Sequence, residues 1–333
     1  MIKLAIDLGS SMTKIYRADT NSGIVLAEPS CVAVSADGEV KAIGKAAKKL
    51  IGKTAEHTDI LYPVYESEIV DMHLATRMMK EFLSRIGLKA TWLTRVQALI
   101  GVPCGIDIRQ LDDYRALADE CGLRGTKFVE QPYLAALGAG AKFGDPVFCL
   151  DVGGGVTNAA VVSGDGIIAG MSMNIGGNNM DANIMFALET EKNLLIGALT
   201  AERLKNEIGS LLNGARGVRV AEGCAVDSRH PAAASVSATE LRESIRVYVD
   251  KVAEYAASVL WNLPAEVAAA VNRNGVYLSG GVMKIPGVAK YIGERLGDMP
   301  YRVCEEPQFT TALGGGVLLR DKELLNKFSL RED

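Results

Sequence analysis

Two segments of the chain share a pattern of an aspartate, a glycine-containing turn and a threonine. The first runs from Asp7 to Lys14 (DLGSSMTK) and the second from Asp151 to Asn158 (DVGGGVTN). Glycines in such a turn let successive backbone N–H groups converge, which creates a binding site for phosphate oxygens. Two such turns facing each other would hold a polyphosphate, and an aspartate beside each turn offers the hard oxygen that hydrated Mg²⁺ prefers.

Individual residues of the two turns have candidate roles. Asp7 and Asp151 are the candidate ligands of Mg²⁺, each through water. Lys14 either directs its ammonium group at the β- and γ-phosphates or is a solvated strand lysine, and we favour the phosphate role. Thr13 and Thr157 are either hydroxyl donors to the ligand or β-branched strand residues. The turn residues predicted to bind phosphate are Gly9, Ser10, Ser11, Met12, Gly153, Gly154, Gly155 and Val156.

A third glycine turn runs from Ser279 to Gly287, after the apolar segment GVYLSG, and is expected to open a helix with Pro286 near its first turn. Its residues Gly280, Gly281 and Val282 are predicted to pass beneath the α-phosphate and the adenosine of a nucleotide. Strand-to-helix turns use glycine routinely, so this turn alone is weak evidence for a nucleotide site. Together with the other two turns it becomes moderate evidence.

The elements that must position these turns follow from apolar periodicity. Short apolar segments bounded by glycine predict buried strands at 4–8, 97–103, 146–152 and 275–280. Helical patterns lie at 107–121, 132–142, 200–212, 286–296 and 310–327. The clearest helix begins at Ser237, where Glu240 completes a capping box, and continues until Pro264. Strands alternate with helices over the whole length, which predicts a doubly wound α/β protein built from two related halves.

Composition excludes several other classes of protein. The 333 residues suffice for about two domains, and the formal net charge of −4 provides no positive field for nucleic acid. Six cysteines without a CxxC pair and three scattered histidines argue against a zinc site, a disulfide framework or a histidine-based catalytic centre. No signal peptide precedes the strand at Ile2 and no segment reaches the about 18 to 20 apolar residues of a membrane span, so the chain is expected to be cytoplasmic.

Taken together, these motifs resemble those of the actin, heat-shock chaperone and sugar kinase ATPase superfamily. The stretches GIVLAEPSCVAV (23–34), IGVPCGI (100–106), VEQPYLAALGAG (129–140), TAERLKNEIGS (200–210) and EEPQFTTALGGGVLL (305–319) are most similar to the bacterial actin family MreB. The resemblance implies an actin-like fold with ATP or ADP and Mg²⁺ bound between two domains. Domain I would comprise 1–147 and 311–333, with a small subdomain at about 33–76. Domain II would comprise 148–310, with a small subdomain at about 182–238.

The resemblance also implies roles for single residues. Gln131 matches the position that orients the attacking water and completes a candidate catalytic set with Asp7 and Asp151; MreB proteins usually have glutamate there, whereas actin has glutamine. A neutral amide is a poor proton acceptor, so slow hydrolysis is expected. Glu130 beside it is a candidate helix cap.

Glu202 and Lys205, three apart on a predicted helix, match residues that contact ribose and adenine; the alternative is an exposed ion pair between the two. The segment 176–181 matches an acidic loop of relatives but carries two asparagines, and its Gly177 is a predicted nucleotide contact.

Two further glycine signals are weaker. Gly52-Lys53-Thr54 ends like a Walker A loop, but Ala47 stands where that motif requires glycine. The residues Gly314, Gly315 and Gly316 fall in a predicted helix, and we favour close packing over an approach to the nucleotide base as their explanation.

These observations favour a filament-forming, MreB-like cytoskeletal ATPase whose protomers stack head to tail. A partner-remodelling ATPase of the chaperone or reactivase type is the alternative, and a small-molecule kinase is a third. Because the motifs continue to about residue 319 and a helix follows them, we expect no substrate-binding domain like that of heat-shock chaperones. Trp92 and Leu93, flanked by Lys89 and Arg95, are either a membrane contact or a cap of the domain core.

Overall fold

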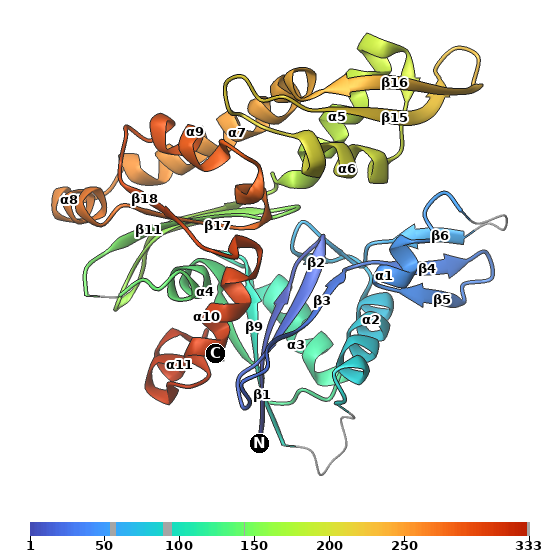
Figure 1. Ribbon diagram of the computed structural model, residues 1–333. Helices are drawn as coiled ribbons and strands as arrows, with labels where there is room; N and C mark the ends of the chain where they lie inside the picture. Colours follow the sequence, from blue (N-terminus) through green and yellow to red (C-terminus); the bar gives the residue numbers. More distant parts are fainter. Residues whose placement is uncertain (54–57, 89–94, 143, 332–333) are drawn as a thin grey trace.

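The computed structural model describes residues 1–53, 58–88, 95–142 and 144–331, and two five-stranded sheets form the centres of its two halves (Figure 1). The first sheet has the order β10-β9-β1-β2-β3, formed by β1 (Ile2–Leu8), β2 (Met12–Arg17), β3 (Gly23–Pro29), β9 (Val96–Val102) and β10 (Lys127–Glu130). The second has the order β13-β12-β11-β17-β18, formed by β11 (Val147–Val152), β12 (Thr157–Ser163), β13 (Gly166–Met173), β17 (Val276–Ser279) and β18 (Tyr301–Val303).

The two sheets have the same topology. In each, three strands form an antiparallel meander, a fourth strand pairs in parallel with the first of them, and a fifth pairs in parallel with the fourth. The registers match as well, because Asp7 lies opposite Lys14 and Asp151 lies opposite Asn158. The predicted internal duplication is therefore a duplication of structure, and each half presents its aspartate at the same point of an equivalent hairpin.

A small three-stranded sheet accompanies each large one. The first consists of β4 (Val32–Ser35), β5 (Val40–Ile43) and β6 (Thr58–Leu61), with the short helix α1 (Lys45–Lys48) packed beside it. The second consists of β14 (Leu194–Leu195), β15 (Val218–Ala225) and β16 (Pro231–Ser237). A two-stranded ribbon, β7 (Val64–Tyr65) and β8 (Glu68–Ile69), follows the first small sheet. These sheets lie within the segments expected for the small subdomains, whose bounds stay a prediction.

The helices at predicted places are α3 (Ile108–Glu120), α4 (Gln131–Gly138), α6 (Ala198–Ile208), α7 (Ala238–Trp261), α9 (Val288–Arg295), α10 (Thr310–Leu318) and α11 (Lys322–Phe328). Three further helices lie where none is predicted from the sequence: α2 (Met72–Arg85), α5 (Gly177–Lys192) and α8 (Ala265–Asn274). The predicted capping box opens α7: Glu240 N donates to Ser237 Oγ, and Ser237 N donates to Glu240 Oε2 at 2.7 Å.

Two predicted helices differ from the structure. The single helix expected at 310–327 is two helices, because Asp321 accepts hydrogen bonds from Glu323 N and Leu324 N and so caps a new helix. The strand β17 leads first into a 3₁₀ turn, Gly281–Lys284, and α9 begins only after Gly287, whose φ of 88° suits glycine. Pro286 therefore precedes the helix instead of lying in its first turn.

The glycines of α10 allow an unusually close contact with α4. A Cβ atom on Gly314 would lie 1.7 Å from the Leu134 carbonyl oxygen, and one on Gly138 would lie 1.9 Å from that of Thr310. Gly315 and Gly316 pack against Ala5 and the Tyr16 ring, in β1 and β2. The packing explanation is thus correct. It also attaches a helix from the end of the chain to the first sheet, as Figure 1 shows.

The apolar cores follow the same division. One cluster lies within each half, and a third joins them, containing Leu99 and Leu134 from the first half and Cys149 and Ala160 from the second. All six cysteines are free, four of them buried. Within the described ranges, no helix is both long enough and apolar enough to cross a bilayer.

Candidate functional site

A cleft between the two halves is lined by all three predicted glycine turns. Both aspartate hairpins contribute, together with the start of α5, one face of α6, the turn between β17 and α9, and the starts of α4 and α10. The lining residues from the sequence predictions are Asp7, Gly9, Ser10, Ser11, Met12, Lys14, Gln131, Asp151, Gly153, Gly154, Gly155, Val156, Gly177, Glu202, Lys205, Gly280, Gly281 and Val282. The two aspartates therefore share one cleft.

The two hairpin turns approach each other directly. A Cβ atom on Gly154 would lie 2.5 Å from Ser11 Cβ, and one on Gly155 would lie 2.9 Å from Ser10 Oγ. Ser10 Oγ in turn accepts a hydrogen bond from Ser67 N in the β7–β8 turn. Glycine is required in the second turn because any side chain there would push the two halves apart.

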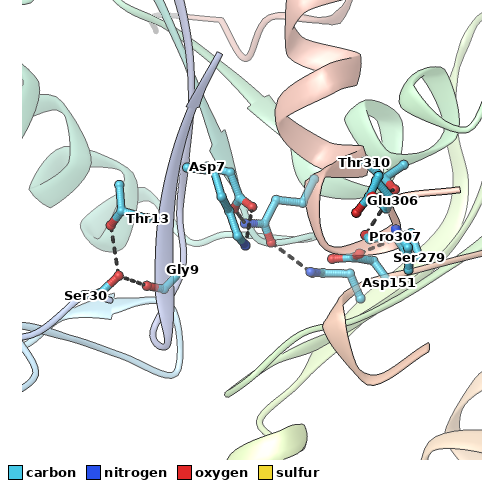
Figure 2. Close-up of polar contacts among 12 residues, drawn as sticks. Asp7, Gly9, Thr13, Ser30, Asp151, Ser279, Glu306, Pro307 and Thr310 are labelled. Carbon is cyan, nitrogen blue, oxygen red and sulfur yellow. Dashed lines mark hydrogen bonds and ion pairs between the residues drawn. The ribbon is translucent and has the colours of Figure 1, made fainter. Parts of the chain in front are cut away.

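Asp7 is the centre of a polar network that spans both halves (Figure 2). Lys14 Nζ donates to Asp7 Oδ2 at 2.8 Å, and Gln131 Nε2 donates to Asp7 Oδ1 at 3.4 Å. The other end of the Gln131 amide accepts from Asn158 Nδ2 at 2.8 Å. Lys14 is thus not a solvated strand lysine, since its ammonium lies in the cleft beside a carboxylate. Asn158, the last residue of the second turn motif, fixes the orientation of the Gln131 amide.

Asp151 lies at the base of the cleft on the other side (Figure 2). Its Oδ1 accepts a hydrogen bond from Ser279 Oγ at 2.6 Å. Burial raises the pKa of Asp151 to about 6; the hydrogen bond from Ser279 opposes this shift and the charge of Asp7 adds to it. Because burial disfavours the ionised form of Asp151, a nearby cation would stabilise that form.

Both threonines of the turn motifs support the hairpins from behind. Each is fully buried, and neither lines the cleft. Thr13 Oγ1 bonds Ser30 Oγ at 2.9 Å, and Ser30 Oγ donates to the Gly9 carbonyl (Figure 2). Thr157 Oγ1 donates to the Ile175 carbonyl at 2.7 Å. Both threonine hydroxyls form hydrogen bonds with protein groups and do not face the cleft. The alternative of buried, β-branched strand residues therefore holds, and the interpretation as hydroxyl donors to the ligand is corrected.

Glu202 and Lys205 both face the cleft, but they do not pair with each other. Lys48 Nζ of α1 lies 2.6 Å from Glu202 Oε2 of α6, so the ion pair joins a helix of the first half to a helix of the second. Lys205 Nζ donates to Asp181 Oδ2 at 2.7 Å and to the Gly177 carbonyl at 2.8 Å. The alternative of an isolated surface ion pair is wrong for this structure.

The segment 176–181 is a helix start instead of a loop. Asn179 Oδ1 accepts from Gly176 N at 2.8 Å and so closes the first turn of α5. Asn178 and Asp181 both line the cleft. One of the two asparagines that replace carboxylates thus has a capping role, which any short polar side chain with an acceptor oxygen can fill.

Other sequence predictions lie away from the cleft or outside the described residues. Glu130 Oε1 accepts from Gly105 N at 2.7 Å and does not cap α4. Gly52 and Lys53 are absent from the cleft lining. Thr54, Trp92 and Leu93 lie outside the described residues.

Comparison with known proteins agrees with this geometry. The model of the MreB/Mbl protein family matches residues 1–327. The chain belongs to the MreB/Mbl family. It is 30% identical over 331 residues to the cell shape-determining protein Mbl of Bacillus subtilis (strain 168), covering 98% of both chains. It is also 30% identical over 330 residues to the cell shape-determining protein MreB of Escherichia coli (strain K12), covering 95% of this chain and 92% of the relative.

Solved structures of other proteins share the architecture. The crystal structure of MreB5 of Spiroplasma citri bound to AMPPNP superposes with a TM-score of 0.90 at 27% identity, over 98% of this chain and 97% of that one. Its ADP-bound form gives a TM-score of 0.89. A MamK double helical filament shares the fold with a TM-score of 0.80 at 20% identity, over 96% of this chain and 99% of that one. The predicted actin-like fold is confirmed.

The cleft of this MreB/Mbl chain fits a nucleotide with a hydrated cation. Glycine backbone lines three sides, and a Cβ atom on Gly281 would meet nothing within 4 Å, so this backbone faces open space. Asp181 Oδ1 and Gln308 Oε1 are buried acceptors without a hydrogen-bond partner among the described residues. No group of three or more metal-ligating side chains forms in the described part of the chain, so a cation here would keep oxygen ligands from water and phosphate.

Sequence reasoning missed several residues of the cleft. They are Ser67, Asn158, Asn178, Asp181, Asn206, Ile285, Gln308 and Thr311. Asn158 and Asp181 lay inside motifs already singled out, so their polarity beside glycine turns was an available signal. Asn178 and Ile285 also lie inside segments predicted to bind the nucleotide, and Asn206, Gln308 and Thr311 lie in stretches that carry the family resemblance. Ser67 alone among these eight lies outside every such segment and reaches the cleft through tertiary packing.

Proposed function

We propose that this chain is an actin-like ATPase that binds Mg-ATP or Mg-ADP between its two halves and polymerises head to tail into filaments. The observation that carries the proposal is the meeting of two equivalent aspartate hairpins in one cleft. The AMPPNP and ADP bound by MreB5 of Spiroplasma citri, and the filament formed by MamK, support the nucleotide and the polymer respectively.

The chemistry proposed for each residue follows from its place. When bound, Mg²⁺ neutralises phosphate charge and makes the terminal phosphorus open to attack. Asp7 and Asp151 hold the water ligands of the cation from opposite halves. Lys14 contributes a positive charge beside Asp7. Gln131 positions a water molecule with its amide, and because an amide is a poor base, turnover is slow.

Polymerisation is proposed as the output of the nucleotide cycle. A ligand held by both hairpins favours the closed arrangement of the two halves, and a closed protomer can present matching surfaces at its two ends. The proposed partner is therefore a second copy of the chain, with no nucleic acid.

The test is negative-stain electron microscopy of the purified protein with and without Mg-ATP, combined with phosphate release. Filaments that form with Mg-ATP and are lost in Asp151→Ala are expected. A monomer that releases phosphate only when a partner protein is added would replace this proposal by a partner-remodelling ATPase.

Membrane contact through Trp92 and Leu93 also stays a proposal. Changing both residues to serine is expected to abolish co-sedimentation of the protein with anionic liposomes. Binding that is unchanged in the variant, or absent in the parent protein, contradicts it.

A further inference from the structure

Asp181 has an oxygen atom for which the protein provides no donor. The residue lies on α5, its relative exposure is 9%, and it lines the cleft. Lys205 Nζ occupies Oδ2 at 2.7 Å. Oδ1 is buried and has no hydrogen-bond partner among the described residues. A buried carboxylate oxygen left in this state costs free energy unless a donor reaches it.

The neighbours of Asp181 place this oxygen on the wall formed by α5 and α6. The charged groups that face Asp181 are Lys205 and Glu202 on α6 and Lys48 on α1. Glu202, the other acidic group of this wall, already pairs with Lys48. Of these two acidic residues, Asp181 is the one with a buried carboxylate oxygen that lacks a partner among the described residues.

The same wall faces the turn after β17, at a distance from the hairpin aspartates. A Cβ atom on Gly177 would lie 3.2 Å from Lys205 Nζ and 3.4 Å from Val282 Cγ2, so the start of α5, α6 and this turn converge. If phosphates lie between the two hairpins, this convergence is where the nucleoside extends. The hydrogen-bond donors of a nucleoside are its ribose hydroxyls and the amino group of its base.

We propose that Asp181 Oδ1 accepts a hydrogen bond from a hydroxyl or amino group of the bound nucleoside, which makes Asp181 a residue that determines nucleoside specificity. Lys205 is the positioning residue, because its ammonium group fixes Oδ2 and leaves Oδ1 directed at the ligand. This inference rests on the proposed function, since it requires a nucleotide in the cleft.

The titration of Asp181 agrees with this role. Burial raises its pKa to about 6, against the opposing effect of Lys205. The carboxylate is therefore an ionised acceptor at pH 7.5 and loses that character as the pH falls below about 6. A donor that binds to the ionised form stabilises it.

The experiment is a thermodynamic cycle in which the Asp181 side chain and the donor groups of the ligand are changed separately and together. Dissociation constants are measured by fluorescence competition, below the protein concentration at which filaments form, for ATP, 2′-deoxy-ATP, 3′-deoxy-ATP and purine riboside triphosphate, which lacks the amino group. The wild type is compared with Asp181→Asn and with Glu189→Gln, which removes a charge from the exposed side of the same helix.

In the wild type and in Glu189→Gln, removal of the one bound donor is expected to weaken affinity about tenfold, as for a hydrogen bond to a charged group. In Asp181→Asn the same removal is expected to cost less than about threefold. The analogue that shows this difference identifies the donor as the 2′-hydroxyl, the 3′-hydroxyl or the base amine.

Loss of all four affinities by one common factor in Asp181→Asn, or no change in any, overturns the proposal. If that variant does not fold, the wild type alone provides the test: its preference for ATP over the identified analogue is expected to disappear between pH 7.5 and pH 5.5. A preference that is constant over this range overturns the proposal. Failure of the wild type to bind any of the four ligands contradicts the proposed function instead.

Discussion

The orientation of the Gln131 amide depends on a side chain from the opposite half of the molecule. Asn158 Nδ2 donates to Gln131 Oε1, while Asn158 Oδ1 accepts from Cys104 N and Ser172 Oγ. These contacts fix the orientation of the Asn158 amide. Because Asn158 Nδ2 donates to Gln131 Oε1, they also fix the orientation of the Gln131 amide. The residue that would hold the attacking water is thus positioned only when both halves are in contact.

Replacement of Asn158 by alanine is expected to lower kcat for phosphate release about tenfold, with KM for ATP almost unchanged. The reason is that the Gln131 amide becomes free to rotate, and a misplaced positioning group costs rate more than binding. Steady-state phosphate release measures both constants. Asn174→Ala, an exposed position, is the control. An equal loss in KM would show that Asn158 acts on binding.

The raised pKa of Asp151 predicts how the ligand-free protein responds to pH. An ordinary aspartate has a pKa of 3.8, whereas that of Asp151 is about 6, so the folded state binds more protons between these values. This group therefore makes the fold more stable as the pH falls from about 6 toward 3.8, and penalises it at pH 7.5.

Asp151→Asn is accordingly expected to stabilise the ligand-free protein at pH 7.5 by about 1 to 3 kcal/mol. The same change is expected to weaken the Mg²⁺ dependence of ATP binding. Urea unfolding at pH 7.5 and pH 5 measures the first effect, which shrinks at the lower pH. Asp119→Asn, on the exposed side of α3, is the control. Destabilisation at pH 7.5 would contradict the assignment.

Among the elements, α4 and α10 are joined by glycine backbone instead of side chains. A helix-interior glycine replaced by alanine normally gains stability. At Gly314 the new methyl group would lie 1.7 Å from the Leu134 carbonyl oxygen, which is backbone and cannot rotate away.

Gly314→Ala is therefore expected to destabilise the protein by about 3 kcal/mol or more. The midpoint of thermal unfolding is the measurement. The control is Gly197→Ala, because an added Cβ there meets nothing within 4 Å. Equal behaviour of the two variants would show that α4 and α10 can separate at little cost.

The elements that carry the chemistry were predictable because each has a local signature. An apolar segment followed by aspartate and glycine predicts each hairpin, and the capping box predicts the start of α7. The break between α10 and α11 was missed because the apolar pattern continues across it and only the side chain of Asp321 interrupts it. The unpartnered acceptor atoms of Asp181 and Gln308 could not be predicted, because whether an oxygen atom finds a donor is decided only when distant elements pack.

At the scale of the whole molecule, the ion pair between Lys48 and Glu202 links α1, which packs beside the first small sheet, to α6, which packs beside the second. The oxygen and nitrogen are 2.6 Å apart, and the two side chains are 26% and 32% exposed. Such a pair contributes modestly, about 1 kcal/mol or less, because solvent screens it. Because Glu202 lines the cleft, the pair lies beside the place proposed here for the nucleoside.

Lys48→Met is expected to raise the dissociation rate of a fluorescent ATP analogue about two- to fivefold. Lys49→Met is the matched control, since Lys49 is the exposed neighbour in sequence. Stopped-flow displacement by excess ATP gives the rate. Reversal of the pair, with Glu at 48 and Lys at 202, is expected to recover part of the loss; equal rates in the two single variants would exclude a closing role for the pair.

The attachment of α10 to the first sheet has a consequence for the order of assembly during synthesis. Gly315 and Gly316 cover Ala5 and Tyr16, so the half of the protein that leaves the ribosome first lacks one wall until residues beyond 318 have emerged. The second half is complete earlier, because its strands are contiguous in the chain from β11 to β18. A nascent chain halted before α10 would thus expose the apolar surface of β1 and β2, and the synthesis of α10 is the step that covers it.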